Sequence, residues 1–171
     1  MAVYGFPHAG SATSVQRLSL EEMSRKSPTI VVARCSDVSS DWDGTRNLAF
    51  TRTTFTILEV VKGTTALTTF TVRMPGGSHD EEVVLFLTGP DGDGFPWVMG
   101  LAQGCYRVFA DPATGKRAVR RSLTGLNLHD GTHDGSVFKP AGQPTQSLET
   151  FLQHITRLVQ TAVPSRQEDR K

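Results

Sequence analysis

The segment His129–Gly135 is the most suggestive local cluster of potential metal ligands in the chain. Two histidines four residues apart, His129 and His133, are each followed by an aspartate, Asp130 and Asp134. Imidazole nitrogens and carboxylate oxygens are ligands that zinc and similar divalent ions take in proteins. Two glycines in the segment favour a loop, in which the spacing alone does not bring the ligands together. Two interpretations follow: a solvated, turn-rich loop, or a divalent metal site that would support a metal-dependent hydrolase.

Recognisable catalytic motifs are otherwise lacking in the sequence. No nucleophile elbow, phosphate-binding P-loop, dinucleotide fingerprint or His-Glu-x-x-His motif occurs. The segment Asp91–Gly94 resembles the start of a calcium loop, but Phe95 and Pro96 follow where an oxygen ligand and a glycine are needed. We therefore predict a plain hairpin turn there, lean against an enzyme, and expect no cofactor apart from a metal ion at the histidine loop.

A small basic patch is formed by Arg117, Arg120 and Arg121. Together with aromatic residues on a neighbouring strand, these side chains could line a groove for single-stranded nucleic acid, as in an OB-type binder. The overall charge argues against that function, because 18 Lys and Arg face 17 Asp and Glu, for a formal net charge of +1. A charged edge strand is the plainer interpretation, and we do not expect a nucleic-acid partner.

The elements that must position these residues are mostly β-strands, between residues 29 and 123. Residues 30–35 are apolar and β-branched, and residues 39–44 are predicted to be a turn with Asp-Gly at its end. Residues 48–61 form a strand too long to stay straight in a small domain, so it should bend at a bulge within residues 57–61. Further strands are expected at residues 70–74, 83–87, 97–101, 105–109 and 116–121.

Two helices flank the strands. Ser19 and Glu22 match a capping box that opens a short helix, which ends before Pro28. Residues 147–163 form an amphipathic helix with Ser147 as its N-cap, and its apolar stripe is expected to pack against the sheet. No apolar run approaches the roughly 20 residues that a membrane-spanning helix needs.

These elements predict one mainly β (α+β) domain. A chain of 171 residues can bury one sizeable core. We expect a small, strongly bent antiparallel β-barrel over residues 17–163, with the short N-terminal helix and the C-terminal amphipathic helix packed on it. Residues 1–16 are expected to be a disordered tail or the remnant of a signal peptide whose apolar segment is missing, and residues 164–171 a charged tail. The long bent strand makes the expected barrel similar to OB-folds, including netrin-like domains.

A series of sequence blocks resembles a group of uncharacterised exported bacterial proteins. The blocks occur in that family's order, and the resemblance covers about residues 12–162. They are residues 12–23, 30–34, 58–63, 72–77, 82–87 and 100–104. The resemblance implies an extracytoplasmic location, periplasmic or secreted, and no assigned activity. This chain departs from the family pattern in lacking the apolar signal segment and in being short between Gly77 and Glu82.

The two cysteines, Cys35 and Cys105, each fall in a predicted strand. A disulfide across the barrel and a pair of buried free thiols are both compatible with that placement. Because the resemblance implies an oxidising compartment, we expect the disulfide. It would close a loop of about 70 residues and stabilise the fold by about 4 kcal/mol.

The leading functional hypothesis is a non-catalytic exported module that binds an envelope protein or another extracytoplasmic macromolecule. Loops on a rigid scaffold commonly carry such binding. The candidate binding residues lie in two loops, and they are Trp42, Asp43, Arg46, Phe95 and Trp97. The metal-dependent hydrolase and the OB-type nucleic-acid binder remain as alternatives.

Overall fold

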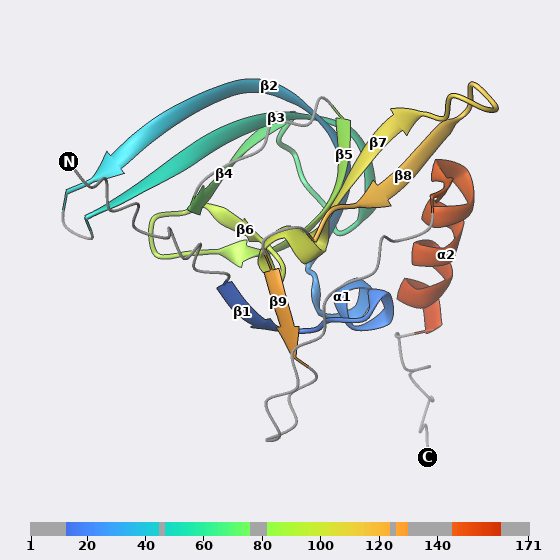
Figure 1. Cartoon of the computed structure of the whole chain (residues 1–171), viewed down its shortest axis with the longest axis horizontal. Coiled ribbons are helices and arrows are strands. Elements are labelled where there is room, and N and C mark those ends of the chain that lie inside the picture. The colour runs from blue at the N-terminus through green and yellow to red at the C-terminus, as the bar shows by residue number, and fades with distance from the viewer. Residues whose placement is uncertain (1–12, 45–46, 76–81, 124–125, 130–144, 162–171) are drawn as a thin grey trace, which may run out of the picture.

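Two strands of 15 residues each, β2 (Thr29–Asp43) and β3 (Leu48–Lys62), form the longest hairpin of the protein. The computed structural model describes residues 13–44, 47–75, 82–123, 126–129 and 145–161 (Figure 1). The other strands are β1 (Thr13–Gln16), β4 (Thr69–Pro75), β5 (Glu82–Pro90), β6 (Pro96–Val98), β7 (Cys105–Ala110), β8 (Arg117–Arg121), β9 (Leu126–His129) and β10 (Gln146–Ser147). The helices are α1 (Leu20–Lys26), the 3₁₀ helix η1 (Leu101–Gly104) and α2 (Leu148–Thr161).

Eight of these strands form one antiparallel sheet in the order β10-β8-β7-β5-β2-β3-β4, with β6 also paired to β5. The remaining two, β1 and β9, pair in parallel as a separate two-stranded sheet. The prediction of a mainly β fold with a multi-stranded antiparallel sheet and two α-helices is thereby confirmed. The described residues 13–16 form β1, although the sequence suggested a tail through residue 16; residues 1–12 and 164–171 lie outside the described residues.

The long hairpin curves across the molecule (Figure 1). Its pairing skips Val61 and Leu58 on β3 and Ser36 on β2, so each marks a bulge in the ladder. Bulges bend a strand and increase its twist. The predicted bend within residues 57–61 is therefore confirmed. The turn predicted at residues 39–44 is wrong except at its end, because pairing with β3 carries β2 on to residue 43, overriding the weak strand preference of serine and aspartate.

The central strands are buried on both faces. Val32 in β2 and Phe86 in β5 belong to the core beneath the helices, whereas Val31 and Leu85 belong to a second core on the opposite face of the sheet. Alternate residues of a strand point to opposite faces, so a strand covered on both sides must be apolar at every position. This explains the unbroken apolar run predicted to be a central strand at residues 83–87.

Both α-helices begin as their capping residues predict. The Ser19 hydroxyl accepts the amide of Glu22 at 3.1 Å, and the Glu22 carboxylate accepts the amide of Ser19 at 3.0 Å. In α2 the Ser147 hydroxyl accepts the amide of Thr150 at 3.1 Å. Phe151 of α2 is fully buried and its ring lies 4.5 Å from that of Tyr106, centroid to centroid, so α2 packs on the sheet as expected.

No disulfide joins Cys35 and Cys105, so the expected bridge is wrong. Cys105 lies in register with Leu85, which lies in register with Val31, four residues before Cys35 on β2. Strand rise and strand spacing therefore separate the two cysteines by more than about 10 Å, whereas a bridge needs α-carbons about 5.5 Å apart. Cys35 and Cys105 pack against the same core, but the register of their strands keeps them apart.

Alkylating the unfolded protein without reductant tests the thiol state. We expect intact mass spectrometry to show two alkyl groups on the chain, because no disulfide joins the two cysteines in the fold. The same protein alkylated after reduction is the control and should give the same mass. A population that takes up alkyl groups only after reduction would contradict the structure.

Removing the Phe151 ring tests the docking of α2. Phe151→Ala should lower the free energy of unfolding by about 3–5 kcal/mol, because it leaves a cavity beside Tyr106 and Phe86. Chemical denaturation followed by circular dichroism measures this change. Gln153→Ala, an exposed position on the same helix, is the control and should stay within about 0.5 kcal/mol of the unsubstituted protein. A loss below about 1 kcal/mol for Phe151→Ala would show that the helix is not anchored there.

Candidate functional site

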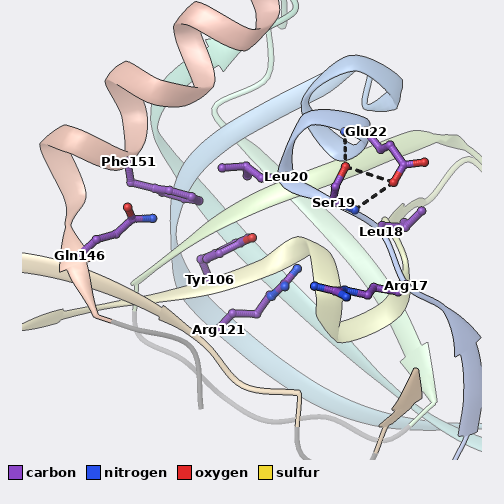
Figure 2. Close-up of a pocket in the computed structure, with 9 residues that line it drawn as sticks. All are labelled: Arg17, Leu18, Ser19, Leu20, Glu22, Tyr106, Arg121, Gln146 and Phe151. Atoms are coloured by element: carbon purple, nitrogen blue, oxygen red, sulfur yellow. Dashed lines mark hydrogen bonds between the residues drawn. The ribbon is translucent and has the colours of Figure 1, made fainter. Parts of the chain in front are cut away.

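A cavity of about 440 Å³ lies where the segment joining β1 to α1 meets β7, β8 and the start of α2 (Figure 2). This volume is in the range of pockets that hold small molecules or parts of larger ligands. Its lining mixes charged, polar and apolar side chains, and consists of Arg17, Leu18, Ser19, Leu20, Glu22, Tyr106, Arg121, Gln146 and Phe151.

Two guanidinium groups face each other at this cavity. Arg17 comes from the segment between β1 and α1, Arg121 comes from the end of β8, and their side chains point toward one another (Figure 2). Burial lowers the pKa of Arg121, and the positive charge of Arg17 lowers it further, while Tyr106 opposes both effects. An arginine nevertheless keeps its charge in a protein. The cavity therefore brings two positively charged side chains together.

The Arg121 guanidinium uses one of its donors on the backbone and leaves another without a partner among the described residues. Its Nη1 donates to the backbone oxygen of Gln103 at 3.2 Å, and its guanidinium carbon lies 5.3 Å from the centre of the Tyr106 ring. Its Nε is buried and, within the part of the chain that the structure describes, has no hydrogen-bond partner. A buried donor without an acceptor costs about 1–3 kcal/mol.

The buried side chain of Gln103 holds the Arg17 segment in place. The Gln103 Oε1 accepts the amide of Leu18 at 2.8 Å, and its Nε2 donates to the backbone oxygen of Gln16 at 2.8 Å. The amide of Arg17 also donates to the backbone oxygen of His129 at 2.9 Å. These three bonds join the chain on both sides of Arg17 to η1 and β9, far away in sequence.

Two glycines allow η1 to present Gln103. Gly100 has a φ of +61°, a conformation that costs energy for residues with a Cβ. A Cβ on Gly104 would lie 2.6 Å from the backbone oxygen of Met99 and 3.1 Å from that of Phe86. Sequence reasoning identified residues 100–104 as a family block but missed the role of Gln103. A polar side chain between two glycines and next to apolar strands is the signal that could have indicated it.

The remaining walls give the cavity an apolar side and one negative charge. Leu18, Leu20 and the rings of Tyr106 and Phe151 form the apolar side. Hydrogen bonds from the amide and hydroxyl of Ser19 hold the pKa of Glu22 below its usual range, so this carboxylate is ionised at neutral pH. Among the described lining residues, the charged groups are two guanidinium groups and one carboxylate.

In the candidate binding loop around Phe95 and Trp97, both residues contact other residues of the protein. Asp91 accepts the amide of Phe95 at 3.0 Å and the indole N–H of Trp97 at 2.8 Å, and these bonds hold the pKa of Asp91 below its usual range. The guanidinium groups of Arg52 and Arg73 lie 5.9 and 5.5 Å from the centre of the Phe95 ring. Both aromatic residues therefore contribute to the fold of a closed turn, as the hairpin prediction for this segment implies.

The other candidate loop is only partly described. Trp42 lies near the end of the β2–β3 hairpin with 59% of its surface exposed. Asp43 ends β2, but its side chain and all of Arg46 lie outside the described residues. Trp42 therefore stays a candidate for surface contact, and it is not among the residues that line the cavity of about 440 Å³.

The three arginines of the basic patch are not brought together. Arg117 forms an ion pair with Glu82, Arg120 lies 4.9 Å from the centre of the Phe109 ring, and Arg121 lines the cavity. Alternation along β8 places Arg120 on the opposite face from its neighbour Arg121. The three arginines therefore lie in separate environments among the described residues, and the groove for a single nucleic-acid strand stays a prediction.

The candidate metal loop is described only at its first residue. His129 is the last residue of β9, whereas Asp130, His133 and Asp134 lie outside the described residues. Within residues 13–44, 47–75, 82–123, 126–129 and 145–161, no group of three or more His, Cys, Asp or Glu side chains is arranged to hold a metal ion. The metal site therefore stays a prediction.

Comparison with known proteins gives this chain no relatives: no protein-family model matches it, and no curated protein is detectably similar to it in sequence. Within the described ranges, neither helix has the length and apolar character to cross a membrane. Because a fold alone does not identify a function, the function has to be argued from the chemistry of the cavity.

Replacing Gln103 with leucine tests whether its amide holds the Arg17 segment. Gln103→Leu should lower the free energy of unfolding by about 2–4 kcal/mol, because the Leu18 amide and the Gln16 carbonyl lose their buried partners. Hydrogen exchange at the Leu18 amide should also become faster. Gln160→Leu, the same change at an exposed position of α2, should alter neither quantity. Unchanged exchange at Leu18 in Gln103→Leu would refute this role.

Proposed function

We propose that this protein is a non-catalytic module that binds another macromolecule by holding an anionic group in the Arg17–Arg121 cavity. The observation that carries the proposal is that the guanidinium groups of Arg17 and Arg121 both line one cavity and point toward one another. Arginine forks are suited to carboxylates and phosphates because they donate two parallel hydrogen bonds.

The chemistry of the lining favours binding over catalysis. The Ser19 hydroxyl and the Glu22 carboxylate bond to each other and to each other's backbone amide, so both groups are used in capping α1. Burial raises the pKa of Tyr106, which keeps its hydroxyl protonated at neutral pH. Among the described residues that line the cavity there is neither histidine nor cysteine. The described lining therefore offers hydrogen-bond donors and charge, and its one hydroxyl–carboxylate pair is engaged in the helix cap.

The finer architecture that we propose is a strongly bent, OB-like barrel. Its support is that β4, the strand at one edge of the sheet, lies close to the turn before β6. Arg73 of β4 forms an ion pair with Asp93 of that turn at 2.5 Å. The location that we propose is extracytoplasmic, and its support is the resemblance to exported bacterial proteins alone. Because no disulfide joins Cys35 and Cys105, a bridge is no argument for that location.

Titration with small anions tests the proposed function. We expect acetate or inorganic phosphate to bind the protein in the millimolar range, detected by NMR at constant ionic strength. Arg121→Met should weaken this binding at least tenfold, because it removes the buried guanidinium. Arg120→Met is the matched control, since it removes the neighbouring charge on the other face of β8, and it should change the dissociation constant less than twofold.

Two results would overturn the proposal. One is the absence of binding by both anions to the unsubstituted protein. The other is an equal loss of binding in Arg120→Met and Arg121→Met, which would indicate a general charge effect. Circular dichroism and the melting temperature confirm that each variant is folded before the comparison is made.

A further inference from the structure

We infer that the Tyr106 hydroxyl binds the same anionic group as the Arg121 guanidinium, so that the cavity takes an oxyanion through two of its oxygen atoms. This inference rests on the proposed function and adds a residue that determines which anions the cavity accepts. Carboxylates and phosphates share this chemistry, because each spreads its negative charge over two or more acceptor oxygens.

The Tyr106 hydroxyl points into the cavity from a side chain that is almost wholly buried. Tyr106 lies in β7 with 5% of its surface exposed, and it is one of the residues that line the cavity. Its ring packs against those of Phe86 and Phe151, at centroid distances of 5.7 and 4.5 Å. Figure 2 shows its oxygen directed to the same side as the Arg121 guanidinium. The packing of the ring therefore fixes where the hydroxyl lies.

This hydroxyl is a donor without a partner. Within the part of the chain that the structure describes, it takes part in no hydrogen bond. Burial raises the pKa of Tyr106 and the charge of Arg121 opposes that effect, so the hydroxyl is protonated at neutral pH and able to donate. A buried tyrosine hydroxyl usually finds a hydrogen-bond partner. The unused donor, aimed into the cavity, therefore points to an oxygen atom of a ligand.

The other charged groups of the described lining next to this hydroxyl do not supply that acceptor. The guanidinium of Arg121 is a donor only, and one of its nitrogens already donates to the backbone. The Glu22 carboxylate accepts hydrogen bonds from Ser19 and Lys26. A charged donor and a neutral donor therefore lie close together with no acceptor between them in the described lining.

An anion with two oxygens fits this pair of donors. The Arg121 guanidinium carbon lies 5.3 Å from the centre of the Tyr106 ring, so both donors are within reach of one small group. One oxygen would accept from the guanidinium and the other from the hydroxyl. A hydrogen bond to an ionised acceptor is about twice as strong as one between neutral groups. A halide ion would offer a single atom to both donors and satisfy them less well.

Removing the hydroxyl alone tests this inference. Tyr106→Phe preserves the ring and its contact with Phe151, so circular dichroism should show an unchanged fold. We expect the dissociation constants of acetate and inorganic phosphate, measured by NMR at constant ionic strength, to rise about tenfold, because one hydrogen bond to a charged group is lost. Thr64→Val removes a hydroxyl from an exposed position outside the lining, and it should change either constant less than twofold. An equally small change in Tyr106→Phe would overturn the inference.

The ¹³C NMR signal of the tyrosine ring carbon that bears the oxygen reports on this bond directly. The chain has two tyrosines, so the signal of Tyr106 is assigned by its loss in Tyr106→Phe. During titration with acetate it should shift in a saturable way, with the dissociation constant that the other signals of the unsubstituted protein give. No shift of this signal at saturating acetate would contradict the assignment of the hydroxyl.

A comparison of anions tests the oxyanion assignment and identifies the source of the oxygens. We expect chloride to bind at least tenfold more weakly than acetate, and equal binding of the two would overturn the requirement for two oxygens. The tighter of acetate and phosphate indicates whether a carboxylate or a phosphate group is held. Anion binding that depends on Arg121 and not on Tyr106 would overturn this inference alone, whereas no binding of acetate or phosphate would overturn the proposed function as well.

Discussion

The two hydrogen bonds of the buried Gln103 side chain determine where the cavity lies and how it is charged. They attach the backbone on both sides of Arg17 to the turn between β6 and β7, more than 80 residues away in the sequence. The same residue accepts a hydrogen bond from Arg121 through its backbone oxygen. One residue therefore positions both arginines. Because a buried amide must satisfy its own donors and acceptor, this arrangement is fixed by the cost of leaving any of these groups unpaired.

The sheet provides the rigid frame on which this arrangement depends. Its central strands are buried on both faces, with one core beneath α1 and α2 and another on the opposite face. The bulges in the long hairpin bend the sheet, and α2 covers the face that carries Tyr106. The cavity then lies at the border of the helix-covered core, where apolar packing ends and charged side chains begin. This position explains why its lining combines an apolar wall with two arginines.

Local patterns in the sequence predicted much of this frame, since they depend on neighbouring residues. The Ser19 capping box, the α2 stripe and the bulges near Leu58 and Val61 are all of this kind. The cavity could not be predicted in the same way, because it depends on contacts between distant segments. The parallel pairing of β1 with β9 and the Gln103 bonds leave no local periodicity. The expected disulfide failed for a related reason, because strand membership does not determine the register that separates Cys35 from Cys105.

The central claim is that the guanidinium groups of Arg17 and Arg121 bind an anionic group of a partner. The most direct measurement is the ¹⁵N NMR signal of the Arg121 side-chain Nε–Hε group during titration with acetate at constant ionic strength. The account predicts that this signal shifts in a saturable way, with the dissociation constant that the other NMR signals of the protein give for acetate. An unchanged Arg121 signal at saturating acetate would contradict the account.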